Sequence, residues 1–184
     1  LLAVSGGWAP RVHLLAQARG SLRFDDPSQS FVPETLPAGW SVTGAANGTQ
    51  NLQQTLDDAA LTAHRISEQL GHPADGPPVP NVTRGMVEPA ETAALEPTAS
   101  RRRQWIDLAH DVTLGDAELA VREGFVSVEH FKRYTTTGMS IDQGKTGNLN
   151  AFVVLGALTA RATSEIGTTT FRPPYVPVTL GAIA

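Results

Sequence analysis

The residues best suited to binding a small anion lie in a glycine-rich loop between two predicted helices. Lys145 and Thr146 stand side by side there, among Gly138, Gly144 and Gly147. Glycines ahead of a helix let successive backbone N–H groups converge on an anion, and the lysine and threonine add a cation and a hydroxyl. The loop therefore predicts a phosphate-type site, with a plain interhelical turn as the alternative.

This loop is not an ordinary P-loop. Residues 144–146 read Gly-Lys-Thr, as at the end of that motif, but the motif needs a glycine five residues before Gly144. Met139 stands at that position. The sequence therefore gives no support for a P-loop nucleotidase.

A second turn of small residues, 44–48, lies between a predicted strand and a predicted helix. The strand is expected at residues 40–43, and the helix at residues 49–70, where apolar side chains recur every three or four positions. A strand, a small-residue turn and a long helix make the last unit of an α/β nucleotide-binding domain. A simple strand-to-helix connection is the alternative.

The residues ahead of this unit predict short elements. Residues 1–4 are typical of the end of a buried strand, and 5–7 of a tight turn. A helix is expected over 9–18, with Pro10 in its first turn and Gly20 at its C-terminal cap. Short strands are expected at 22–24 and 31–32.

A proline-rich linker, residues 71–100, separates this part from a predicted small all-α domain. Its six prolines disfavour both helix and central strand. After it, Thr113 and Asp116 have capping-box spacing, which predicts a helix from there to Glu123 with Gly124 as its cap. Ser127 is a good N-cap for the next helix. The last helix is expected over 149–163.

Composition excludes several classes of protein. The net charge of −4 argues against a nucleic-acid partner. The chain has no cysteine, so disulfides and thiolate metal sites are excluded, and a cytoplasmic location is compatible with this. No apolar run approaches a membrane span. The five histidines show no metal-ligand spacing, and no acid–base pair stands out, so we expect no metal and no catalytic residue.

The sequence from Val128 to Asn148 resembles the alpha subunits of heterotetrameric sarcosine oxidase. Four more blocks resemble the same family in the same order, and together the five span nearly the whole chain, apart from a weak match over 71–104. The blocks are residues 4–20, 42–48, 111–124 and 167–175. Alpha subunits of that family are several times longer, so the resemblance implies an internal segment.

The resemblance implies an α+β fold in two parts. Residues 1–70 would be the C-terminal remnant of an α/β FAD/NAD(P)-binding domain, followed by the linker 71–100. Residues 101–165 would form the small helical domain. Residues 166–184 would lead into a folate-binding, aminomethyltransferase-like domain that is missing from this sequence.

The helical domain is similar to a [2Fe–2S] module that has lost its ligands. In related amine dehydrogenases two cysteine pairs bind the cluster, and the matching positions here are Asp107, Ala109, Asp142 and Gly147. Such a cluster needs four thiolates, so this chain cannot hold one. The two carboxylates could bind a hard cation, with solvent-facing or ion-paired acids as the alternative.

The cofactors and partners follow from the same resemblance. It implies FAD in a beta subunit, FMN at the alpha–beta contact, NAD in the alpha subunit, tetrahydrofolate in the missing domain, and beta, gamma and delta partner subunits. Candidate NAD contacts are Gly44, Ala45, Ala46 and Gly48, with Ser5, Gly6 and Gly7 as weaker ones. Candidate FMN contacts are Arg133, Lys145, Thr146 and Arg172.

The implied activity is oxidative demethylation of sarcosine to glycine. Oxygen would be reduced to hydrogen peroxide, and the one-carbon unit would pass to tetrahydrofolate. Two alternatives stay open: a related oxidase or dehydrogenase of another N-methyl amino acid, and a non-catalytic helical interaction module.

Overall fold

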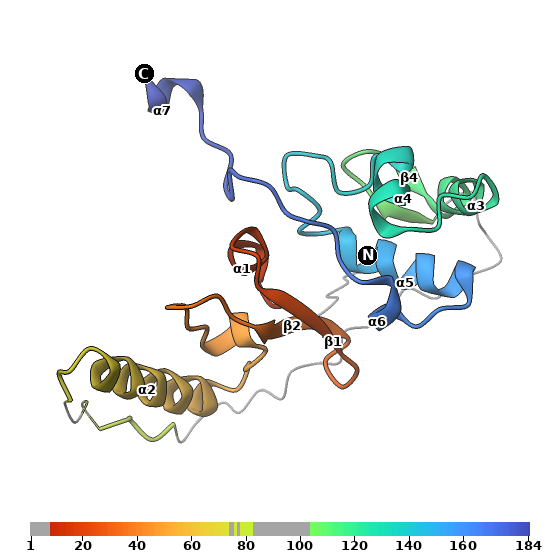
Figure 1. Cartoon of the computed structure of the whole chain (residues 1–184). Coiled ribbons are helices and arrows are strands. Elements are labelled where there is room, and N and C mark those ends of the chain that lie inside the picture. The colour runs from red at the N-terminus through yellow and green to blue at the C-terminus, as the bar shows by residue number, and fades with distance from the viewer. Residues whose placement is uncertain (1–7, 74–75, 77, 83–103) are drawn as a thin grey trace, which may run out of the picture. The chain divides into compact units, whose positions relative to one another are not determined.

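The computed structural model describes residues 8–73, 76, 78–82 and 104–184. The chain divides into two compact units, Leu1–Ala93 (unit 1) and Ala94–Ala184 (unit 2), shown in Figure 1. The boundary falls within the proline-rich segment 71–100. Helices and small antiparallel sheets occur together, which confirms the predicted α+β class. The predicted strand 1–4 lies outside the described residues.

A β-hairpin organises the start of unit 1 and confirms the two short strands predicted there. Its ladder places Phe24 opposite Phe31, whose rings meet edge to face with centroids 5.2 Å apart. Aromatic pairs favour this geometry because the positive edge of one ring faces the negative face of the other. The strands are β1 (Ser21–Asp25) and β2 (Ser30–Thr35), preceded by helix α1 (His13–Gln17).

Helix α1 is shorter than the predicted 9–18. Val12, at its N-cap, has no side-chain oxygen to accept from the first-turn N–H groups. At the other end Arg19 takes the left-handed conformation, with φ 67°. The Gly20 N–H then donates to the Leu15 carbonyl at 2.9 Å, as in a Schellman ending. The left-handed position thus falls on Arg19, and Gly20 follows it.

The predicted strand at residues 40–43 was wrong. A turn precedes this segment, with the Trp40 N–H donating to the Pro37 carbonyl at 3.1 Å, and the described part of the chain offers no neighbouring strand for it. Without a partner, a strand leaves its backbone polar groups unpaired. The segment leads instead into a short 3₁₀ helix, η1 (Gly44–Asn47).

The long helix predicted over 49–70 is confirmed as α2 (Leu52–Gln69). Asn51 caps it, because its side-chain oxygen accepts from the Gln54 N–H at 3.2 Å. None of the residues of α2 is buried, although its apolar side chains recur at helical spacing. Neither α2 nor any other helix of the described residues is long and apolar enough to cross a membrane.

Unit 2 is built mainly from helices around one apolar core. The side chains of Leu114, Phe131 and Leu155 are each at most 1% exposed. The predicted capping box is confirmed: the Asp116 carboxylate accepts from the Thr113 N–H at 2.8 Å, and the Thr113 hydroxyl oxygen accepts from the Asp116 N–H at 3.3 Å. The helices are α3 (Leu114–Arg122), α4 (Val128–Thr135), α5 (Asn148–Thr159), α6 (Thr163–Ile166) and α7 (Leu180–Ile183).

Two details of unit 2 differ from the predicted all-α domain. A small antiparallel ladder pairs β3 (Trp105–Asp107) with β4 (Val112–Thr113). The last predicted helix ends early, because Ala160 takes the left-handed conformation with φ 53°. The chain then turns, and the Arg161 N–H donates to the Gly156 carbonyl at 3.0 Å.

The glycine-rich loop, residues 136–147, is folded around a carboxylate of its own. Asp142 accepts from the Gly144 N–H, the Thr146 N–H and the Thr146 hydroxyl at 3.2, 3.2 and 3.0 Å. Burial alone would raise the pKa of Asp142. These hydrogen bonds and the Lys145 charge lower the pKa by more than burial raises it, so it lies below its ordinary value. The anion held by these backbone N–H groups is therefore internal.

Two buried polar side chains fasten the same loop to the rest of unit 2. The Asp107 carboxylate, 5% exposed, accepts from the Gly138 N–H at 2.7 Å and from the Ala109 N–H at 2.9 Å. Asn148, also 5% exposed, fills the space beside Gly138 and Gly144. A Cβ added at Gly144 would lie 2.0 Å from the Asn148 Oδ1 atom. Both glycines have positive φ, so the loop needs them for conformation and for space.

Three positions that match cluster cysteines in the resemblance lie together at this point. Asp107 bonds to the Ala109 N–H, and a Cβ on Gly147 would lie 3.4 Å from the Asp107 Cβ. Both oxygens of the Asp107 carboxylate therefore accept hydrogen bonds from backbone N–H groups. Among the described residues no three acidic or histidine side chains gather as a metal site.

We expect Gly144→Ala to destabilise unit 2 by about 2–5 kcal/mol, since left-handed strain of about 1–2 adds to overpacking of about 1–3. Gly124→Ala is the matched control, because Gly124 has φ 89° but no atom within 4 Å of an added Cβ. Urea unfolding would be followed by Trp105 fluorescence in a Trp8→Phe, Trp40→Phe background. Equal losses for the two variants would contradict the packing at Asn148.

Asp142→Asn should lower the stability of unit 2 at neutral pH. A carboxyl whose folded pKa is depressed contributes stability above its unfolded pKa, about 3.9, and loses that contribution as pH falls through the folded pKa. The difference between wild type and Asp142→Asn should therefore be constant above about pH 5 and shrink below about pH 4. Urea unfolding at a series of pH values measures it. A difference that stays the same down to pH 3 would rule out the charged contact.

Candidate functional site

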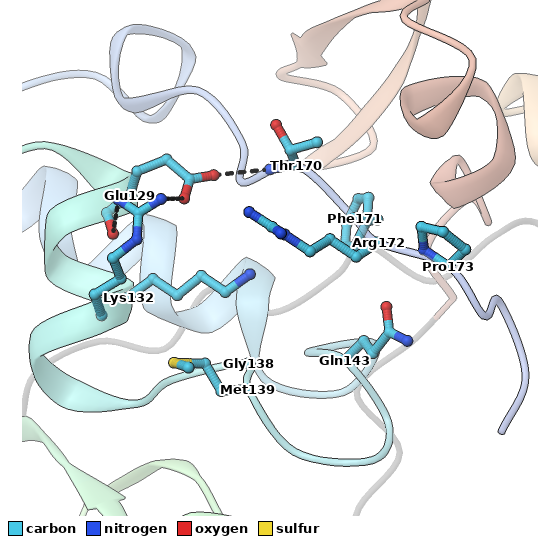
Figure 2. A pocket seen from close by; sticks show the side chains of 10 residues that line it. Glu129, Lys132, Gly138, Met139, Gln143, Thr170, Phe171, Arg172 and Pro173 are labelled. Carbon is cyan, nitrogen blue, oxygen red and sulfur yellow. Dashed lines mark hydrogen bonds and ion pairs between the residues drawn. The ribbon is translucent and has the colours of Figure 1, made fainter.

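A pocket of about 910 Å³ lies among the described residues of unit 2. One wall comes from α4, a second from the glycine-rich loop at Gly138, Met139 and Gln143, and a third from residues 170–173. Figure 2 shows these three segments around a common space. The volume lies within the range of pockets for ligands the size of a small cofactor.

Three cations and one carboxylate line this pocket. Lys132 and Arg133 come from the last turn of α4, and Arg172 comes from the opposite wall, with Glu129 as the acid. The pocket therefore carries a formal charge of about +2, whereas the whole chain carries −4. A positive pocket on a negative chain favours an anionic ligand.

Glu129 is occupied by contacts of its own. One carboxylate oxygen lies 3.3 Å from the Arg133 guanidinium, and the other accepts from the Thr170 N–H at 2.9 Å. Glu129 thus neutralises much of the Arg133 charge and fastens the third wall of the pocket to α4. This leaves Lys132 and Arg172 as the cations available for a ligand.

Lys132 and Arg172 face each other across the pocket without an anion between them. Their side chains extend into the same space in Figure 2, and neither forms a hydrogen bond or ion pair with the described residues. Burial lowers the pKa of Lys132; Glu129 opposes this, and the positive charges of Arg172 and Arg133 lower the pKa further. A bound phosphate would relieve both the burial cost and the repulsion.

Arg133 and Arg172, two of the four FMN candidates, do line this pocket. Lys132 was missed, although it stands next to Arg133 in the sequence. The available signal was its spacing from Glu129: the acid and both cations occupy one face of a helix at i, i+3 and i+4.

Lys145 and Thr146, the other two candidates, are engaged elsewhere. The Thr146 N–H and hydroxyl donate to Asp142. The Lys145 ammonium donates to the Tyr175 carbonyl at 2.6 Å and lies 4.7 Å from the centroid of the Tyr175 ring. Neither residue lines the pocket. The structure therefore does not bring them to a shared anion site with Arg133 and Arg172.

The NAD candidates of unit 1 form η1 and its end. The Gly44 N–H donates to the Asp58 carboxylate of α2 at 3.2 Å, so the N-terminus of η1 already faces an anion from the chain. Gly48 packs against β2, where an added Cβ would lie 2.9 Å from Val32. Ala45 and Ala46 lie within η1. Ser5, Gly6 and Gly7 lie outside the described residues.

Comparison with known proteins identifies the family. Residues 101–184 match the family model described as the sarcosine oxidase A3 domain. The chain is 37% identical to the sarcosine oxidase subunit alpha of Rhizobium meliloti (strain 1021), over 99% of this chain and 18% of that protein. It is 35% identical to the subunit alpha of Corynebacterium sp. (strain U-96), over 100% of this chain and 20% of that protein.

A solved structure shares the fold. The L-proline dehydrogenase from P. horikoshii superposes with a TM-score of 0.67 over 96% of this chain and 37% of that one, at 21% identity. The chain spans about a fifth of the length of the curated relatives that it matches. On its sequence and its matching domain, this chain belongs to the family of sarcosine oxidase alpha subunits.

Proposed function

We propose that this segment serves a heterotetrameric sarcosine oxidase by holding the phosphate of FMN where the alpha subunit meets the beta subunit. The observation that carries the proposal is the pair Lys132, which is half-buried, and Arg172, which is exposed: the two cations line one pocket, and no carboxylate of the described residues forms an ion pair with either. Membership in the family suggests a flavin as the ligand, and the cations of the pocket provide the positive charge that suits its phosphate.

The pocket fits a phosphate monoester for three reasons. Two cations on opposite walls can contact different oxygens of one dianion, and charge-assisted hydrogen bonds of this kind contribute roughly 1.5–3 kcal/mol each. Glu129 is tied to Arg133 and Thr170, so it is held away from the ligand. Exposed Met139, on the loop side of the pocket, offers apolar contact beside the charges.

In the proposed complex the whole enzyme oxidises sarcosine to glycine. FAD in the beta subunit would accept the two electrons of the N-methyl amine, and oxygen would take up two electrons and two protons to give hydrogen peroxide. FMN, when bound, would supply an electron relay between the two. The one-carbon unit passes to tetrahydrofolate in another part of the alpha subunit, and the gamma and delta subunits complete the assembly.

Residues of this segment would bind and orient rather than carry out the chemistry. Lys132 and Arg172 hold the phosphate end, which fixes where the ring system of the flavin can lie. The contact of NAD with residues 44–48 stays a prediction, because the Gly44 N–H donates to Asp58 in this structure.

The first test compares FMN with riboflavin, which lacks the phosphate. The 184-residue chain should bind FMN more tightly than riboflavin, as measured by quenching of flavin fluorescence. Lys132→Met and Arg172→Met should each weaken FMN binding about tenfold and leave riboflavin binding unchanged. Arg122→Met is the matched control, since it removes one exposed positive charge from α3, away from the pocket. Equal affinity for the two flavins would exclude the phosphate site.

The second test uses the fact that the chain has only two lysines, Lys132 and Lys145. Reductive methylation with ¹³C-formaldehyde labels both lysines and the N-terminal amine, and the signals lost in Lys132→Arg and in Lys145→Arg assign the two lysines. The Lys132 signal should titrate below pH 10.5, and FMN should raise that midpoint, because an anion favours the charged amine. FMN affinity should correspondingly fall as pH rises through the Lys132 pKa, but not in Lys132→Arg. A Lys132 midpoint unmoved by FMN would place the phosphate elsewhere.

A further inference from the structure

Residues 169–175, here called the strap, form the wall of the pocket that carries Arg172. The Thr170 N–H donates to Glu129 at 2.9 Å, and the Asn148 amide donates to the Thr169 hydroxyl at 3.4 Å. Thr169 is 1% exposed and Phe171 is 8% exposed, so the first half of the strap is anchored in unit 2. These contacts fix the chain just before Arg172.

The second half of the strap is held by side chains of the glycine-rich loop. Gln143 donates to the Pro174 carbonyl at 2.7 Å, and Lys145 donates to the Tyr175 carbonyl at 2.6 Å. The Lys145 ammonium also lies over the Tyr175 ring, where the negative face of the ring attracts it. Arg172 therefore lies between two points at which hydrogen bonds hold the strap, one at α4 and one at the glycine-rich loop.

We infer that Lys145 is a positioning residue for the anion pocket, acting through Tyr175 and the strap rather than by touching the ligand. The inference rests on the proposed function, because the property that Lys145 controls is phosphate affinity. Three features support it. Lys145 does not line the pocket, its ammonium has two contacts on one strap residue, and the loop that carries it is fixed by Asp142, Asp107 and Asn148.

A fixed loop is necessary for this role, because a lysine can position the strap only if its own backbone stays in place. The Lys145 N–H donates to the Asp142 carbonyl at 3.2 Å, and the Asn148 N–H donates to the Gly144 carbonyl at 3.0 Å. The backbone at Lys145 is thus held by hydrogen bonds on both sides. Loss of the ammonium should free residues 173–175, let the Arg172 guanidinium sample more orientations and weaken the phosphate contact.

The test is a double-mutant cycle on FMN affinity in the 184-residue chain, with Lys145→Met, Tyr175→Leu and the double variant. Lys145→Met removes both the bond to the Tyr175 carbonyl and the contact with the ring, so it should weaken FMN binding about three- to tenfold. Tyr175→Leu removes only the ring contact and should weaken binding by less, and the double variant should bind FMN no worse than Lys145→Met. Lys145→Arg should restore binding, because a guanidinium can donate to the carbonyl and stack on the ring. Tyr175→Phe is the control that keeps the ring.

Additive losses in the double variant would mean that Lys145 and Tyr175 act independently, as expected if Lys145 contacts the phosphate directly, and would overturn the inference. Hydrogen exchange of a peptide covering the strap, measured without ligand, separates this result from failure of the proposed function. Exchange should be faster in Lys145→Met and Tyr175→Leu than in wild type, whether or not FMN binds. Unchanged exchange in both variants would equally overturn the role of Lys145.

Discussion

The structure of unit 2 depends on satisfying the polar groups of its glycine-rich loop from within the chain. A buried N–H that lacks a partner costs about 1–3 kcal/mol, and in this loop the hydrogen bond of the Gly138 N–H is buried and that of the Gly144 N–H is partly buried. Asp142 accepts from the N–H groups of Gly144 and Thr146, while Asp107 accepts from that of Gly138. Because these N–H donors are already hydrogen-bonded, the loop acts as a rigid support. The cations available for a ligand, Lys132 and Arg172, lie in the pocket beside it.

The pocket next to the loop differs, because it brings together positive charges that its own residues do not neutralise. Lys132 and Arg172 are brought close although like charges repel, and burial adds to the cost for Lys132. The surrounding elements sustain this arrangement: α4 is capped by Ser127 and packed through Phe131, and the strap is anchored at Thr169 and Phe171. A folded protein can maintain such local strain where a ligand relieves it, and a half-buried lysine of lowered pKa beside a second cation in a cleft therefore points to a binding site.

Local signals in the sequence predicted much of the fold. The Thr113–Asp116 capping box, the Ser127 cap and the apolar spacing of α2 each act within a few residues, and all three are confirmed. The strand at 40–43 was wrong because pairing depends on distant partners. Arg133 and Arg172 were found as candidates, but Lys132 was not, and the pocket became visible only when the fold brought α4 and the strap together. The sequence also shows Asp142 two residues before Gly144, which in retrospect marks the anion that the loop binds.

The most direct measurement is a crystal structure of the assembled oxidase with FMN bound. The account predicts that the FMN phosphate lies within hydrogen-bond distance of the Lys132 ammonium and the Arg172 guanidinium, while Lys145 keeps its contact with the Tyr175 carbonyl. A phosphate on the Lys145 ammonium and the N–H groups of the glycine-rich loop, with Asp142 displaced from them, would contradict it.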